Sequence, residues 1–179
     1  QLMTAIWSSL ILGIILAFPY LLWELWRFIS PGLTKKEIKS SRGFMFIASF
    51  LFFCGIAFSF YVIAPISIHF LYNYKISDVI QNNFTLESHI GLVTNMLLGV
   101  SVLFELPVLV YFLTKIGLVT PEFLKTYRKH ALVLVLILAA IITPPDVASQ
   151  IIVAIPILVL YEISIKVSRM VIKKQKKDA

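Results

Sequence analysis

The sequence predicts an all-α, polytopic membrane protein: a transmembrane helix bundle with five spans, forming one integral membrane domain over residues 1–179. Hydrophobic residues make up 59% of the chain and charged residues 14%, with a mean hydropathy of +0.92, whereas a globular domain is roughly half apolar and a quarter charged. Uncharged stretches recur at the length that crosses a bilayer, about 20 residues of helix. The net charge of +7 therefore relates first to membrane orientation and not to nucleic-acid binding.

Five apolar segments are the predicted spans. The first three cover about residues 5–26, 44–71 and 90–113. The fourth, 131–142, amounts to roughly 18 Å of helix, and the fifth covers 147–165, so the last two helices are expected to be short. A helix too short for the bilayer thins the membrane or attracts partners that cover the mismatch. Residues 166–179 are expected to form a basic tail.

Four of the five spans contain an internal proline, namely Pro19, Pro65, Pro107 and Pro156. Proline removes a backbone N–H and bends a helix, and membrane helices tolerate it when neighbours compensate. Two interpretations stay open: ordinary membrane-helix composition, or a curved and cupped bundle.

The basic residues predict the orientation. Fifteen of the sixteen lie on one side of the predicted spans, and Lys75 alone lies on the other. The positive-inside rule places that side, including the loops 30–42 and 114–130 and the C-terminal tail, in the cytoplasm. The chain begins with Gln1, which five spans place outside, and we expect a complete protein to have one more helix upstream.

The third span carries an acidic residue at membrane depth, Glu105. An ionised carboxylate there costs several kcal/mol, so such residues usually face a bundle interior or a wet cavity and tend to be functional. Pro107 adds a predicted kink. The alternative is a structural carboxyl group that is bonded to a neighbouring helix.

The remaining polar candidates have structural interpretations too. Glu37 follows Thr34 in a capping-box pattern, or else offers a carboxylate that can pair with arginine through two parallel hydrogen bonds. Asp146, in the turn after Thr143, can cap the following helix. Gln150 can hydrogen-bond a neighbouring helix, which contributes about 0.6 kcal/mol on average.

Two acidic residues near span ends, Glu24 and Glu162, are expected to pair with Arg27 and Lys166 on their own helices. The single cysteine, Cys54, lies in an apolar segment and is interpreted as a packing residue.

The sequence argues against an enzyme. The three histidines are far apart, the glycines form no phosphate-binding loop, and no serine-nucleophile signature is present. We therefore expect no catalytic residues, no metal site and no cofactor.

Several motifs together resemble the TatC family, the multi-spanning receptor of the twin-arginine protein translocase. They occur in the family's order and spacing across nearly the whole chain. They are residues 26–33 followed by Lys35, Lys36 and Glu37; residues 104–108; the pair Arg128-Lys129; residues 143–146 with Ser149 and Gln150; and residues 154–156 leading to 160–162.

The resemblance implies a six-helix, cupped protein with both termini in the cytoplasm, of which this chain holds helices two to six and lacks the N-terminal segment, the first helix and most of the first outer loop. It also implies residue roles. Glu37, with Phe28 and Pro31, is similar to the family's contact for the twin-arginine motif of signal peptides. Glu105 resembles the family's buried carboxylate. A third group of residues resembles the family's docking area for the single-span partners TatA and TatB, namely Thr143, Asp146 and Gln150.

The function implied by the resemblance is a receptor and core component that moves folded proteins across the membrane, driven by the proton motive force. The implied setting is the bacterial inner membrane, in a complex that contains further copies of the chain. The residues leave two alternatives: a proton-coupled secondary transporter fragment that uses Glu105 as its relay, or a scaffold whose acidic groups only fix its helices.

Overall fold

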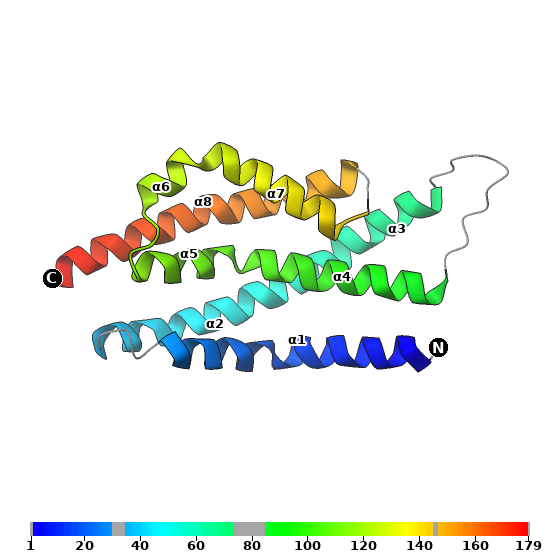
Figure 1. Ribbon diagram of the computed structural model, residues 1–179, viewed down its shortest axis with the longest axis horizontal. Helices are drawn as coiled ribbons and strands as arrows, with labels where there is room; N and C mark the ends of the chain where they lie inside the picture. Colours follow the sequence, from blue (N-terminus) through cyan, green and yellow to red (C-terminus); the bar gives the residue numbers. More distant parts are fainter. Residues whose placement is uncertain (1, 30–34, 74–84, 145–146, 179) are drawn as a thin grey trace.

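The structure is a computed structural model that describes residues 2–29, 35–73, 85–144 and 147–178. All regular elements in these ranges are helices, which run side by side along the long axis of the molecule (Figure 1). The all-α prediction is confirmed. The helices are α1 (Leu2–Ile29), α2 (Lys35–Phe58), a π-helical segment (Ser59–Ile63), α3 (Ala64–Asn73), α4 (Leu86–Phe104), α5 (Leu106–Lys115), α6 (Pro121–Thr126), α7 (Arg128–Ile142) and α8 (Val147–Asp178).

The second predicted span is one helical rod whose hydrogen-bond pattern changes near its proline. The π-helical segment ends two residues before Pro65. Proline lacks an N–H and its ring clashes with the carbonyl four residues earlier, so the local widening into a π-helix accommodates it. The rod continues as α3, and the candidate span here is Met45–Asn73.

The third predicted span is interrupted at the charged residue. α4 begins after Thr85, whose side chain accepts a hydrogen bond from the Ser88 N–H at 3.2 Å, and ends at Phe104. Glu105 separates α4 from α5, and Pro107 occupies the first turn of α5, where proline fits because that turn needs no N–H donor. The predicted kink at Pro107 therefore corresponds to a break between two helices.

Gly117 ends α5. It has φ +79°, a conformation that glycine adopts without strain, and the Leu118 N–H donates to the Leu113 carbonyl at 2.9 Å across it. Thr120 then caps α6, accepting a hydrogen bond from the Phe123 N–H at 3.2 Å. The chain thus turns back within a few residues after the third span.

The last two helices differ in length, which partly corrects the sequence prediction. α7 has 15 residues, whereas α8 has 32 residues and runs to Asp178. The expectation of a short final helix is wrong, because the charged residues after residue 165 are good helix formers and no glycine or proline interrupts them. The basic tail predicted for residues 166–179 continues the same helix as far as Asp178. The apolar span ends before the helix does.

By length and composition, four described helices could cross a membrane: Leu2–Arg27, Met45–Asn73, Glu87–Lys115 and Val147–Lys176. The predicted fourth span corresponds to α7, whose 15 residues are fewer than the roughly 20 that a bilayer requires. The prediction of apolar membrane helices is confirmed, and the count of five spans stays a prediction. In Figure 1 the end of α7 and the start of α8 lie well short of the far ends of α3 and α4.

The core lies where the π-helical segment, α4, α7 and α8 meet, around Ile63, Met96, Val100 and Ile157, all fully buried. α5 packs along α8, and α2 along α4. Gly55 allows the α2–α4 approach, since a Cβ at this position would lie 2.6 Å from the Ser101 Cα. α1 lies at the side of the bundle, next to α2 and α4.

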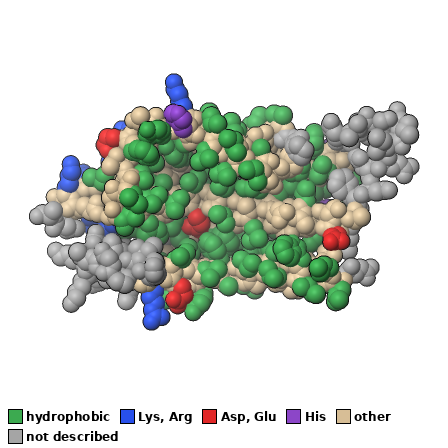
Figure 2. All heavy atoms as spheres, in the orientation of Figure 1, with side chains coloured by type: hydrophobic (Ala, Val, Ile, Leu, Met, Phe, Trp, Pro, Cys, Tyr) green, Lys and Arg blue, Asp and Glu red, His purple; other side chains and the backbone are tan. Residues whose placement is uncertain are grey.

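Hydrophobic side chains cover most of the face in Figure 2, and basic side chains gather toward the end that holds the C-terminus. That end also contains the last turns of α1 and α5, together with α6. The described elements next to the predicted basic loops and tail, which are the last turns of α1 and α5, α6 and the end of α8, therefore lie at one end of the bundle (Figure 1).

Candidate functional site

Glu105 lies in a groove between three elements. A cavity of about 420 Å³ is bounded by α1, α2 and the α4–α5 break. We call it the Glu105 groove, and its walls include Phe18, Leu22 and Leu25 of α1, Met45 and Ala48 of α2, and Val102, Val108 and Phe112 around Glu105. Among the described lining residues, every other side chain is apolar.

The helix break determines where Glu105 lies. Its backbone N–H donates to the Val102 carbonyl at 3.1 Å, and its carbonyl accepts from the Val108 N–H at 2.9 Å. The residue thus joins two helices with its backbone satisfied. Both carboxyl oxygens are buried and have no hydrogen-bond partner among the described residues.

The Glu105 groove can bind a ligand that combines a hydrogen-bond donor or a cation with an apolar segment. A buried polar group without a partner costs free energy, so a ligand that brings a hydrogen-bond donor or a cation to this carboxyl group gains that interaction. The apolar walls suit a hydrophobic segment beside that donor. The groove is therefore suited to an apolar chain that carries one polar contact.

Aromatic side chains hold the groove's outer wall. Phe18 of α1 stacks on Phe52 of α2, with ring centroids 3.5 Å apart. Trp26 of α1 lies against Phe112 of α5, with centroids 5.6 Å apart, and is buried. These contacts attach α1 to the bundle on both sides of the groove.

The sequence did not identify the groove. It singled out Glu105 from its unusual position, but the walls come from α1 and α2 as well, which are far away in the chain. Only contacts reveal them, and the local signal at Phe18 or Met45 is that of any membrane helix.

The predicted signal-peptide contacts lie on the α1–α2 connection. Phe28 is in the last turn of α1 and Glu37 in the first turn of α2; their side chains, and all of Pro31, are outside the described residues. The adjacent parts of α1 and α2 supply Leu25 and Met45 to the Glu105 groove. The structure therefore brings the backbone of Phe28 and that of Glu37 to the same end of the molecule as one end of the groove (Figure 1).

The predicted partner-docking residues lie around the α7–α8 turn, and Asp146 falls outside the described part of the chain. Thr143 is buried and its hydroxyl donates to the Ala139 carbonyl at 2.8 Å. The Gln150 side-chain amide donates to the Leu136 carbonyl of α7 at 3.0 Å, which confirms the predicted contact with a neighbouring helix. Ser149, one residue earlier, is hydrogen-bonded to Ser67 of α3 at 2.8 Å.

One predicted ion pair is confirmed and another is wrong. Arg27 Nη1 and Glu24 Oε1 lie 3.9 Å apart on the exposed surface of α1. Glu162 does not pair with Lys166 on its own helix; Arg128 of α7 donates to it at 2.8 Å. The two helices pack together, and the long guanidinium reaches across their interface, which sequence spacing on one helix cannot reveal.

Cys54 is half-buried beside the main core cluster, in agreement with its interpretation as a packing residue. Among the residues that the structure describes, no group of three or more His, Cys, Asp or Glu side chains could hold a metal ion.

Comparisons with known proteins agree with this architecture. The family model described as "Sec-independent protein translocase protein (TatC)" matches residues 1–156. The chain is 44% identical over 170 residues to the TatC protein of Blattabacterium sp. subsp. Periplaneta americana (strain BPLAN), covering 95% of this chain and 64% of that protein. It is 46% identical over 169 residues to that of Helicobacter pylori (strain J99), covering 94% of this chain and 68% of that protein.

A solved structure described as the crystal structure of the twin arginine translocase receptor TatC superposes with a TM-score of 0.77 at 32% identity, covering 96% of this chain and 75% of that one. A second, described as the same receptor in DDM, gives a TM-score of 0.78 at 34% identity, covering 92% and 73%. The chain thus spans about two thirds to three quarters of the proteins it resembles.

The matched proteins are components of a protein translocase and not enzymes, which agrees with the helical membrane architecture and with the expectation drawn from the sequence. On these matches, which extend over nearly the whole chain, the protein belongs to the TatC family of Sec-independent protein translocase proteins.

Proposed function

We propose that the protein carrying this chain is the receptor and core component of a twin-arginine translocase, which binds twin-arginine signal peptides and moves folded proteins across the membrane. One observation carries the proposal: 96% of the chain superposes on a structure described as the twin arginine translocase receptor. The proposal extends what is known of that receptor to this chain.

Glu37 is the proposed contact for the arginine pair, with Phe28 and Pro31 beside it. A carboxylate accepts two parallel hydrogen bonds from one guanidinium. The surrounding loop is otherwise basic, so a carboxylate there is a local acceptor in a field that repels other cationic peptides. This pairing favours arginine over lysine, since an ammonium group is a point charge without the planar fork.

The Glu105 groove is the proposed place for the apolar part of the signal peptide. It extends from the helix break toward Leu25 of α1 and Met45 of α2, and its described walls are apolar apart from Glu105. A peptide whose arginines lie at the connection would therefore find an apolar path beside it. Glu105 would then contact a polar group of the inserted segment or of a partner helix.

The α7–α8 turn is the proposed docking area for TatA- and TatB-type single-span partners. Thr143 and Gln150 use their polar groups within the chain, but apolar side chains nearby, such as Ile141, Val147 and Ile151, are exposed. A short α7 supports local thinning of the bilayer. The active complex is proposed to contain several copies of the chain in the bacterial inner membrane, with the basic end in the cytoplasm and the proton motive force as energy source.

A proton-coupled transporter is not favoured by the structure. A relay needs successive polar groups within hydrogen-bond reach, and the described walls around Glu105 offer none. If the protein is only a scaffold, substitutions of Glu37 and Glu105 lower its stability and leave signal-peptide binding unchanged. Measuring stability and binding in the same variants distinguishes the two alternatives.

Photocrosslinking to a twin-arginine signal peptide tests the proposal. Glu37→Ala is expected to abolish the crosslink while the protein still inserts into the membrane at normal levels. Glu122→Ala is the matched control, because Glu122 is an exposed carboxylate on α6, at the same end of the bundle. Unchanged crosslinking in Glu37→Ala, or equal loss in both variants, contradicts the assignment of Glu37.

A further inference from the structure

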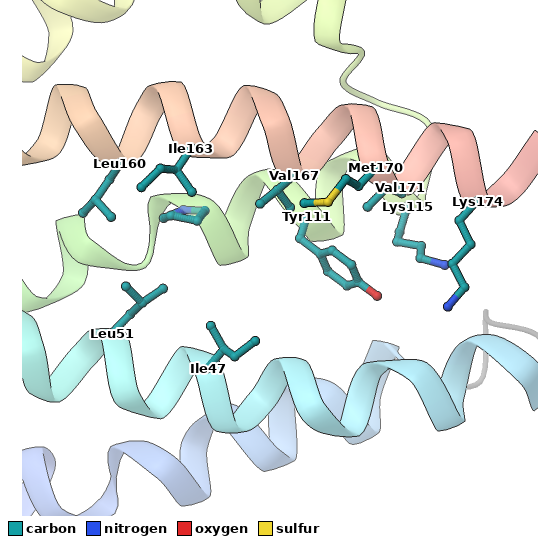
Figure 3. A pocket seen from close by; sticks show the side chains of 11 residues that line it. Ile47, Leu51, Tyr111, Lys115, Leu160, Ile163, Val167, Met170, Val171 and Lys174 are labelled. Carbon is teal, nitrogen blue, oxygen red and sulfur yellow. The ribbon is translucent and has the colours of Figure 1, made fainter.

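A second pocket lies on the other side of α5 from the Glu105 groove. It has a volume of about 400 Å³ and is bounded by α2, α5 and α8, within the roughly 300–1,000 Å³ of typical small-molecule sites. Its walls are apolar, with Leu51 of α2 and Ile163 and Val167 of α8 among them. Two lysines, Lys115 and Lys174, also line it, and we call it the lysine-rimmed pocket (Figure 3).

The polar groups of this pocket lie together. Figure 3 shows the amino groups of Lys115 and Lys174 and the hydroxyl of Tyr111 toward one end, and the apolar side chains along the rest. The two lysines come from different helices, which are joined at this point: the Gln175 side-chain amide donates to the Lys115 carbonyl at 3.1 Å. Next to Lys115, the Thr114 hydroxyl donates to the Ser168 hydroxyl of α8 at 2.9 Å.

The position of the lysines relative to a membrane follows from the candidate spans. Lys115 is the last residue of Glu87–Lys115, and Lys174 lies near the end of Val147–Lys176. Both therefore lie where the apolar layer gives way to head groups, and the apolar walls continue from them into that layer. Juxtamembrane lysines attract anionic lipids, and basic pockets between membrane helices bind their head groups.

We infer that the lysine-rimmed pocket binds an anionic phospholipid, with the phosphate between Lys115 and Lys174 and an acyl chain along the apolar walls beneath them. Tyr111 adds a hydroxyl donor on the same side of the head group. The charge of the rim selects an anionic head group, and the apolar depth selects a lipid over free phosphate.

Native mass spectrometry of the delipidated protein, titrated with phosphatidylglycerol or phosphatidylcholine, tests this inference. Phosphatidylglycerol is expected to bind to the unaltered protein. The double variant Lys115→Gln/Lys174→Gln is expected to bind it roughly 30-fold more weakly, because each lysine near the membrane surface contributes a factor of about five to the affinity. The control is Lys125→Gln/Lys129→Gln, which removes two exposed lysines that lie at the same end of the bundle but do not line the pocket.

A third variant tests the apolar part. Val167→Phe keeps both lysines and places a ring in the pocket, so it is expected to weaken phosphatidylglycerol binding by at least tenfold while inorganic phosphate has no effect as a competitor. The inference is wrong if the two double variants lose affinity equally, if phosphatidylcholine binds as well as phosphatidylglycerol, or if Val167→Phe binds like the unaltered protein. It is also wrong if the pocket variants retain the lipid but lose a copurifying protein subunit, since the pocket would then hold a protein.

Discussion

At the scale of a single residue, the sequence identified Glu105 as unusual but did not predict what surrounds it. A carboxyl group in the middle of an apolar span is unusual enough to be identified from the sequence, and the nearby Pro107 predicted a kink, which the structure shows as a break between α4 and α5. The surroundings were not predictable, because the groove walls come from two other helices. In the structure, the carboxyl oxygens are buried without a hydrogen-bond partner in the described part of the chain.

A first prediction follows for the stability of Glu105→Gln. Because the carboxyl group makes no internal hydrogen bond that the structure describes, its replacement is expected to change the free energy of unfolding by less than about 1 kcal/mol. SDS titration in mixed micelles measures this, with Glu87→Gln at the exposed start of the same span as control. Crosslinking of signal peptides to groove positions is expected to fall in Glu105→Gln alone. A loss of more than 2 kcal/mol with unaltered crosslinking would instead support the scaffold alternative.

The Arg128–Glu162 pair gives a second prediction. Both side chains are about half exposed, at 50% and 51%, so screening by solvent limits the pair to roughly 0–1 kcal/mol. A double-mutant cycle with Arg128→Gln and Glu162→Gln is expected to give a coupling energy in that range, decreasing as salt is added. A coupling above about 2 kcal/mol, or one insensitive to salt, would mean that the pair is shielded from water, contrary to the observed exposure.

At the scale of elements, the sequence predicted where the helices lie better than where they end. Hydropathy located the apolar cores of α1, α2–α3, α4–α5 and α8, because lipid requires about 20 apolar residues whatever the tertiary structure. It placed the end of the last span at residue 165, whereas the helix α8 continues to Asp178. Hydropathy measures the membrane boundary, and helix termini depend on glycine, proline and capping residues, as Gly117 shows at the end of α5.

The α2–α4 contact gives a third prediction. Gly55→Ala places a Cβ 2.6 Å from the Ser101 Cα, and this backbone neighbour can move only if the helices separate. The expected destabilisation is about 1–3 kcal/mol, measured by the same SDS titration.

Gly91→Ala is the matched control on α4, because a Cβ there meets nothing within 4 Å and alanine favours the helix by roughly 0.5–1 kcal/mol over glycine. Equal effects of the two substitutions would contradict the close approach of α2 and α4.

At the scale of the whole molecule, the segregation of charge was predictable and the packing was not. Described basic side chains that are far apart in the chain gather toward one end of the bundle (Figure 2), as the positive-inside rule requires of residues on one side of a membrane. Because each span carries the chain to the opposite side of the membrane, successive loops are expected to lie on alternate sides. Which helices pack together, such as α5 along α8, depends on side-chain shape and on contacts such as that between Thr114 and Ser168.

Orientation gives a fourth prediction. With Cys54 replaced by serine, Thr85→Cys and Glu122→Cys each introduce one thiol at an exposed position, at opposite ends of the bundle. A membrane-impermeant maleimide added to intact cells is expected to label Thr85→Cys and to spare Glu122→Cys until the membrane is permeabilised. The reverse pattern would place the basic end and Glu37 outside the cell, where no cargo peptide arrives.

The most direct test of the proposed receptor is the affinity of the purified protein, in lipid nanodiscs, for a fluorescent signal peptide that carries either two arginines or two lysines. We expect the arginine peptide to bind at least tenfold more tightly, a difference of about 1.4 kcal/mol, and we expect Glu37→Ala to remove this preference while Glu122→Ala preserves it. Equal binding of both peptides to the unaltered protein, or an arginine preference that survives Glu37→Ala, would contradict it.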